Sequence, residues 1–166
     1  MIFPDFPADA RVWLYTARDP LTPGAEAALL GALRSFFGAW RSHGRIVRGE
    51  AAVLDHRFIA VTATVEGGSI SGCGIDQHVR EVERVAAEQG LAWASGLDVA
   101  YRDANGAVRM ATRAAFRALG HAGEVGADTP VFALDVNTLE ALQSDFERPA
   151  AASWHAGLLP MTAIPT

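Results

Sequence analysis

Two stretches of the chain carry apolar residues at the spacing of an amphipathic helix. In residues 22–43 the apolar side chains recur every three or four positions, behind a Thr22-Pro23 pair that is typical of a helix start. These apolar positions are Leu29, Leu33, Phe36 and Trp40. In residues 74–89 the corresponding positions are Ile75, Val79, Val82 and Ala86. We therefore predict a helix over each stretch.

The segments between and after these helices favour β-strands, because they are short, rich in β-branched residues and bounded by turn residues. The predicted strands are residues 10–15, two strands within 47–65 around a turn at Asp55-His56, 99–102 and 108–110 around Asn105-Gly106, and 131–134. Two short helices are predicted as well. Thr112 caps the first of them, and Asn137 to Glu140 have the form of a capping box.

The order of these elements is β-α-β-β-α-β, followed by β-α-β-α. The first six match the split βαβ arrangement, so we predict an α+β protein with a ferredoxin-like core and a C-terminal extension. A chain of 166 residues, half of them apolar, fits a single domain over 1–166 with a sizeable core. Residues 150–166 are rich in alanine and proline, and we expect an irregular tail packed on that core.

Composition and charge limit the partners and the cellular location that we expect for this protein. The net charge of −5 argues against nucleic acid or an anionic membrane as the main partner. No apolar run approaches the roughly 18 residues of a membrane helix, and residues 1–7 lack the features of a signal peptide. One cysteine cannot form an internal disulfide, so we expect a cytoplasmic protein. No cofactor is indicated, and a homodimer is an open alternative.

All fourteen basic residues are arginine, and this excludes two kinds of chemistry. Schiff-base catalysis requires a lysine amine. A nucleotide-binding P-loop also requires a lysine, in the motif GxxxxGK[ST]. A dinucleotide-binding loop is not indicated either, because the glycines near position 70 do not follow the GxGxxG spacing.

The glycine-rich segment 67–76 holds the only cysteine, Cys73, at the predicted start of the second helix. A helix N-terminus presents unpaired N–H groups and the positive end of the dipole, so a thiol there tends toward the nucleophilic thiolate. An anion can occupy the same place, and Ser71, Gly72 and Gly74 are candidate ligand-binding residues. The structural alternative is that the cysteine packs, the serine caps the helix and the glycines build a turn.

A catalytic thiol needs a base, and the candidates are His43, in the last turn of the first predicted helix, and His155, in the tail. His78 is a poor candidate, because five residues of helix turn its side chain well away from Cys73. Asp76 is the candidate orienting carboxylate. No histidine spacing in the chain indicates a metal site.

Three of these assignments have structural alternatives. Asp76 in the first turn of a helix also offsets the dipole and is placed to pair with Arg80. Trp40 is a candidate ligand-binding residue, but it also continues an apolar helical stripe, which favours the core. Trp154 is the second aromatic candidate, and a tail that carries tryptophan must bury it or leave an adhesive surface.

Several segments of the chain occur together in one bacterial family. They are Trp13-Leu14-Tyr15, Trp40 with His43-Gly44, Arg57-Phe58, Ser71-Gly72-Cys73-Gly74-Ile75-Asp76, Tyr101, Val131-Phe132, Pro149 and Ser153-Trp154-His155. In these segments the chain resembles proteins of Bacteroidetes and their relatives that have no established activity and often carry the inherited label "ABC transporter ATPase". The resemblance spans nearly the whole chain. Its most specific parts are the SGC-x-ID segment and the SWH tail.

The resemblance implies a constellation of residues rather than a reaction. Its members here are Trp40, His43, Ser71, Cys73, Asp76, Trp154 and His155. Family members usually have a serine at the position of Gly74. The ATPase label is contradicted by the missing lysine and the missing Walker A motif.

Two hypotheses of function follow from these residues. In the first, the chain is a cysteine-dependent enzyme that acts on a small molecule, with Cys73 as nucleophile, His155 or His43 as base and Asp76 as orienting carboxylate. In the second, it is a non-catalytic binding or interaction domain, and the SGCGID segment is a structural helix start. Composition does not separate the two.

Overall fold

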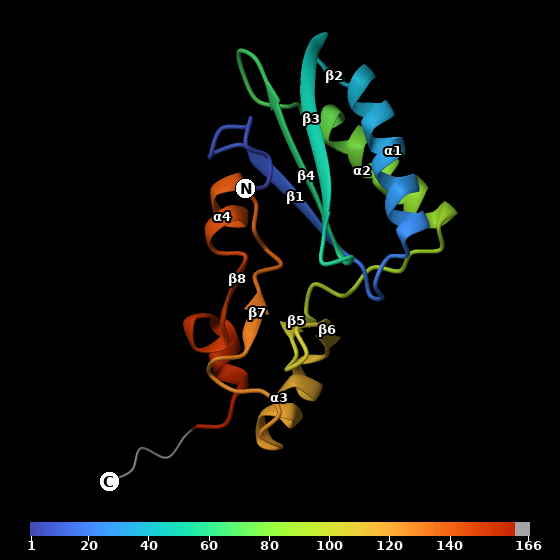
Figure 1. The fold of residues 1–166 in the computed structure, drawn as a ribbon. Helices are drawn as coiled ribbons and strands as arrows, with labels where there is room; N and C mark the ends of the chain where they lie inside the picture. Colours follow the sequence, from blue (N-terminus) through green and yellow to red (C-terminus); the bar gives the residue numbers. More distant parts are fainter. Residues whose placement is uncertain (162–166) are drawn as a thin grey trace. The chain divides into compact units, whose positions relative to one another are not determined.

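A computed structural model describes residues 1–161, and the chain divides into two compact units. Unit 1 comprises residues 1–93 and 135–144, and unit 2 comprises residues 94–134 and the chain from 145 onward. Each unit contains a four-stranded antiparallel sheet and its own helices (Figure 1). The prediction of an α+β protein is therefore confirmed.

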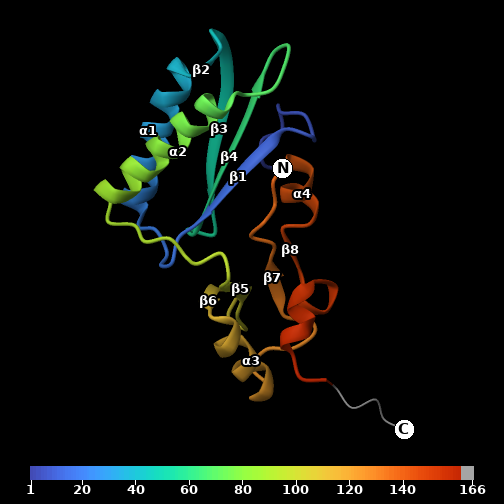
Figure 2. The same ribbon diagram turned by 180° about the vertical axis from the view of Figure 1, so that it is seen from behind.

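Unit 1 is built on a sheet with the strand order β1-β4-β3-β2. Its elements are β1 (Arg11–Thr16), α1 (Pro23–Ala39), β2 (Arg41–Ser42), β3 (Arg45–Leu54), β4 (Phe58–Val65), α2 (Gly72–Glu88) and α4 (Leu139–Ser144). Helices α1 and α2 cover the same face of this sheet, as both ribbon views show (Figures 1 and 2). The turn between β3 and β4 lies at Asp55-His56, as predicted, and both residues have positive φ.

The core of unit 1 lies between the two long helices and the sheet. Alternate residues of a strand point to the same face, so Ile59 and Val61 of β4 both meet the helices. From α1, Leu33 is fully buried against them, and Val82 of α2 completes the contact. The apolar positions of α1 therefore face the core, as the sequence predicts.

Unit 2 has the strand order β6-β5-β7-β8. Its elements are β5 (Val99–Arg102), β6 (Val108–Ala111), α3 (Arg113–His121), β7 (Pro130–Phe132), β8 (Glu147–Pro149) and two 3₁₀ turns, η1 (Ala150–Ala152) and η2 (Trp154–Leu158). Phe116 of α3 is fully buried in its core, together with Val99 and Val131. From the expected tail, Ala150 and Leu158 join this core, whereas residues 162–166 of the tail lie outside the described part.

The ferredoxin-like arrangement is not confirmed, because its sixth element lies elsewhere. The order β1-β4-β3 is the one that a split βαβ core requires for its first three strands. The fourth strand of that core would be Val99–Arg102, which is β5. It pairs instead with β6 and β7 in the sheet of unit 2.

The first helix is shorter than predicted, and this moves His43. Helix α1 ends at Ala39, and Trp40 has extended backbone angles. The carbonyl oxygen of Trp40 accepts a hydrogen bond from the N–H of Val47 at 3.1 Å, which turns the chain into the β2–β3 hairpin. His43 therefore lies in the turn of that hairpin, with a φ of 50°, and not in the last turn of a helix.

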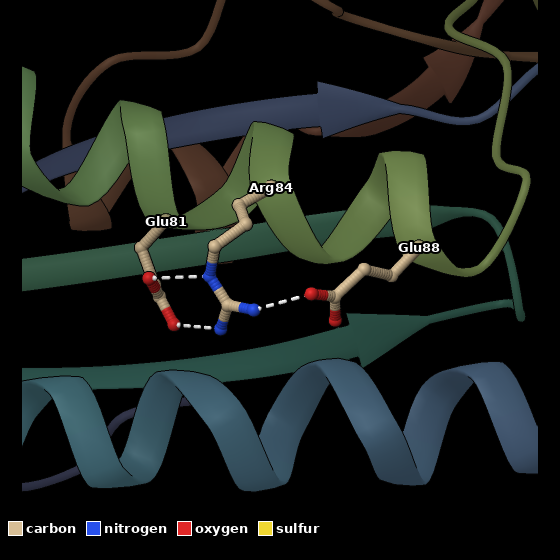
Figure 3. A network of polar contacts seen from close by, with 3 residues as sticks. All are labelled: Glu81, Arg84 and Glu88. Carbon is tan, nitrogen blue, oxygen red and sulfur yellow. Dashed lines mark hydrogen bonds and ion pairs between the residues drawn. The ribbon is translucent and has the colours of Figure 1, made fainter.

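The solvent side of α2 carries a small charge network (Figure 3). The guanidinium of Arg84 contacts both carboxylate oxygens of Glu81, at 3.1 Å and 2.7 Å, and one oxygen of Glu88 at 2.6 Å. Hydrogen bonding and attraction from Glu81 raise the pKa of Arg84 above its usual range. The spacings are i,i+3 and i,i+4, which bring side chains together on one helix face.

Candidate functional site

The glycine-rich segment ends in a tightly bonded start to α2. Ser71 is the N-cap, and its Oγ accepts a hydrogen bond from the N–H of Gly74 at 3.1 Å. The buried Ser42, from β2, donates its hydroxyl to the same Oγ at 3.0 Å and accepts the N–H of Ser71 at 2.9 Å. The polar groups of Ser71 are thus occupied within unit 1.

Trp40 ties this helix start to the end of α1. Its side chain is 1% exposed, and its indole N–H donates to the carbonyl of Gly74 at 2.9 Å. A side chain at Gly74 would press on its neighbours, because a Cβ there would lie 3.0 Å from Cγ2 of Ile70 and 3.3 Å from Oγ of Ser71. Trp40 and Gly74 are therefore structural parts of this corner as the structure stands.

Two of the predicted catalytic residues lie at the same helix start. Cys73 is the second residue of α2 and its thiol is exposed. Asp76 is also exposed, in the first turns of the same helix. The predicted thiol at a helix N-terminus is therefore present and open to solvent.

The SWH segment lies in unit 2, whereas Cys73 lies in unit 1. His155 is 2% exposed, and its Nδ1 shares a hydrogen bond of 2.7 Å with Oγ of Ser153. Its ring stacks on that of Trp154, with centroids 3.9 Å apart, and lies 6.2 Å from that of Phe116. His155 is thus a buried member of the core of unit 2, and Trp154 covers it from outside.

A groove of about 520 Å³ lies beside the glycine-rich segment, within unit 1. One wall is the segment itself, from Gly68 to Ile70, and another is the N-terminal stretch from Pro7 to Arg11. The floor comes from the end of β4, residues 63–65. Its volume lies within the range of small-molecule pockets. The sequence predicted a candidate site at the loop but could not predict this groove. The two walls of the groove are some sixty residues apart along the chain.

The charged groups of this groove are Arg11 and Asp9. The guanidinium of Arg11 lies over the ring of Trp13, 5.1 Å from its centroid, and this contact limits the freedom of the side chain. On the other wall the loop is held by Arg45, which donates to the carbonyl of Glu66 at 3.0 Å and to that of Gly67 at 2.6 Å. Contacts within unit 1 thus hold the side chain of Arg11 and the start of the loop.

His78, a poor candidate base by its sequence position, is a buried polar residue whose burial the sequence did not predict. It is 0% exposed, and its ring lies 4.5 Å from that of Trp13 and 5.5 Å from that of Trp40. Nε2 shares a hydrogen bond of 3.0 Å with the hydroxyl of Tyr15, while Nδ1 has no partner at hydrogen-bonding distance and angle among residues 1–161. The signal was its position four residues from both Gly74 and Val82, on the buried face of α2.

Burial determines the protonation of this cluster. Desolvation is the main cause that lowers the pKa of His78 from 6.5 to about 4. The backbone of Ile75 raises this pKa in part, and the positive charge of Arg11 lowers it. Desolvation, together with the negative charge of Glu83, raises the pKa of Tyr15 above its usual range. The imidazole and the phenol are therefore both neutral near pH 7.

Among residues 1–161, no helix is long and apolar enough to cross a membrane. Within the same residues, no group of three or more His, Cys, Asp or Glu side chains is placed to hold a metal ion. No protein-family model, curated protein or solved structure matches the chain.

Proposed function

We propose that unit 1 is a non-catalytic binding domain whose ligand is a small anionic molecule in the groove beside the glycine-rich segment. The observation that carries this proposal is the groove of about 520 Å³ between the N-terminal stretch and residues 68–70, with Arg11 among its lining residues. An arginine presents several donors in a fixed plane, which suits carboxylate and phosphate groups. Thr64 and Ser69 line the same groove.

The bonding at the start of α2 supports a structural role for the SGCGID segment. The hydroxyl of Ser71 and the carbonyl of Gly74 are both engaged inside unit 1, by Ser42 and Trp40. A ligand that used these groups would have to displace bonds that hold the corner together. The groove is lined by the preceding residues of the loop, Gly68 to Ile70. A ligand there does not need the hydroxyl of Ser71 or the carbonyl of Gly74.

Titration with inorganic phosphate and with citrate tests the proposal. Amide NMR signals of Gly68 and Ser69 should shift saturably at concentrations up to about 20 mM, and Arg11→Ala should weaken binding at least about tenfold. Arg18→Ala is the matched control, because Arg18 is also an exposed arginine of unit 1 and does not line the groove. Absence of a saturable shift, or equal binding by the Arg11 and Arg18 variants, would refute the proposal.

Thiol chemistry at Cys73 is the second candidate function, and the exposure of the thiol in the first turn of a 17-residue helix favours it. The rate of alkylation by iodoacetamide as a function of pH measures it, and Cys73→Ser, which leaves no thiol in the chain, provides the blank. A midpoint near or above about 8.5 would reject an activated nucleophile. A midpoint well below that value would support it.

We further propose that the chain belongs to the bacterial family with the SGC-x-ID and SWH segments, and that it acts in the cytoplasm. The first proposal rests on the segments themselves, and the second on a single unpaired thiol. A solved structure of a family member tests the first, since it should contain both sheets in the same strand order. Fractionation of the source cells tests the second.

A further inference from the structure

The exposed face of α3 in unit 2 carries basic residues that form no ion pair with an acidic side chain of residues 1–161. Arg113, Arg117 and His121 are all exposed, and their spacing of four places them on one face of the helix. Two other arginines of unit 2 form ion pairs: Arg102 binds Glu147 at 2.6 Å, and Arg109 binds Asp103 at 2.8 Å.

Arg113 and Arg117 form no such ion pair in the part of the chain that the structure describes. Arg113 donates to the backbone carbonyl of Leu97 at 3.1 Å, and Arg117 makes no ion pair or side-chain hydrogen bond within residues 1–161. The stripe is therefore locally positive on a chain whose net charge is −5.

Two large apolar side chains are exposed beside this stripe. Leu97 is 65% exposed and Trp154 is 49% exposed. Arg113 connects them, because its guanidinium lies 4.7 Å from the ring centroid of Trp154 while it also binds the carbonyl of Leu97. We refer to Leu97, Arg113, Arg117 and Trp154 as the Trp154 patch.

The indole of Trp154 is held in place before any partner binds. One of its faces stacks on the buried ring of His155, with an interplanar angle of 25°, and Arg113 lies over the ring as well. His155 is itself fixed by Ser153, which also donates to the carbonyl of Ala150 at 3.1 Å. A rigid tryptophan loses little side-chain entropy on association, and tryptophan and arginine are the residue types most enriched among energetic hot spots of interfaces.

We propose that the Trp154 patch is a docking site for an acidic segment of a partner protein that carries apolar residues beside its carboxylates. The carboxylates would bind the guanidinium groups of Arg113 and Arg117, and the apolar side chains would cover Leu97 and Trp154. Charge complementarity selects this partner over a basic one. A nucleic acid fits less well, because Leu97 offers no stacking surface and the chain as a whole is negative.

A short synthetic peptide of alternating glutamate and leucine is the probe, with a lysine–leucine peptide as its charge-reversed control. The indole N–H signal of Trp154, assigned from Trp154→Ala, should shift saturably with the first peptide only. Raising the salt concentration should weaken this binding, because the contacts of the carboxylates with Arg113 and Arg117 are ionic.

Matched variants separate the patch from general charge effects. Arg117→Gln and Ala115→Glu lower the net charge by the same amount, and Ala115 is exposed on a different side of α3. Arg117→Gln should weaken binding about fivefold and Ala115→Glu should leave it unchanged. Leu97→Ser should weaken it about as much, without disturbing the fold, because the side chain of Leu97 is exposed.

Three outcomes would overturn the proposal. The first is a Trp154 signal that no glutamate–leucine peptide shifts. The second is equal binding of the lysine–leucine peptide. The third is saturable binding of a single-stranded oligonucleotide at this patch in place of the peptide.

Discussion

Acidification should destabilise unit 1 through His78. In the folded state this imidazole is neutral, because burial lowers its pKa to about 4. In the unfolded chain the same group has its ordinary pKa of 6.5 and takes up a proton below that pH. The unfolded state therefore binds more protons between these values, and the free energy of unfolding falls as the pH decreases from about 6.5 to about 4.

The magnitude follows from the difference between the two pKa values. A pKa difference of one corresponds to about 1.4 kcal/mol of stability. The full effect is therefore about 3 kcal/mol, and about 2.5 kcal/mol of it should be lost by pH 4.5. Among the surroundings of His78, the backbone of Ile75 favours a charged ring, but burial outweighs it. Trp13 and Trp40 flank the ring, and Arg11 is the charged group whose field reaches it.

Urea unfolding from about pH 8 to about pH 4.5 measures the effect, with tryptophan fluorescence as the signal. Three of the four tryptophans lie in unit 1. The wild type should lose about 2.5 kcal/mol more than His78→Gln over this range, because glutamine keeps a polar contact with Tyr15 and does not titrate. His43→Gln is the control, since His43 is exposed and its removal should leave the wild-type slope unchanged.

The difference between the two curves isolates His78 from the carboxylates, which titrate in both proteins. Parallel curves for the wild type and His78→Gln would refute the reasoning. They would mean that the buried ring accepts a proton in the folded state as easily as in the unfolded one.

Other predictions concern the corner at the start of α2 and its surface, and urea unfolding measures them all. Trp40→Phe removes the donor to the carbonyl of Gly74 and should lower the free energy of unfolding by about 1–3 kcal/mol. Gly74→Ala should destabilise by about 1 kcal/mol, whereas Gly72→Ala, whose new Cβ would crowd no other described part of the chain within 4 Å, should not; equal stability of the two would contradict the close packing at Gly74. Glu88→Gln removes one exposed contact of Arg84 and should leave the unfolding midpoint unchanged.

The local features of this fold follow from short stretches of sequence. Thr22, Ser71 and Thr112 each cap a helix, and in each case the side-chain oxygen accepts the N–H three residues later. The turn at Asp55-His56 and the hairpin around Gly106 are likewise where the sequence predicts them. A cap or a turn depends on a few neighbouring residues, so its signal is contained in the sequence that forms it.

The arrangement of strands could not be predicted in the same way. The hairpin signal at Asn105-Gly106 pairs β5 with β6, but nothing in the residues of β5 indicates whether its other edge pairs with β1 or with β7, because that pairing joins segments far apart in the chain. The end of α1 is also decided by a contact with another part of the chain. Trp40 continues the helical stripe, yet its carbonyl bonds to Val47 in another element and ends the helix.

For the candidate site, the sequence by itself determined that Cys73 stands at a helix N-terminus behind a glycine-rich loop, and that neither lysine chemistry nor a P-loop is available. Only the tertiary structure decided what surrounds that loop. It placed Arg11 in the lining of a groove beside the loop and buried His78 among aromatic rings. Caps depend on neighbours in sequence, whereas grooves and buried side chains depend on which distant surfaces pack together.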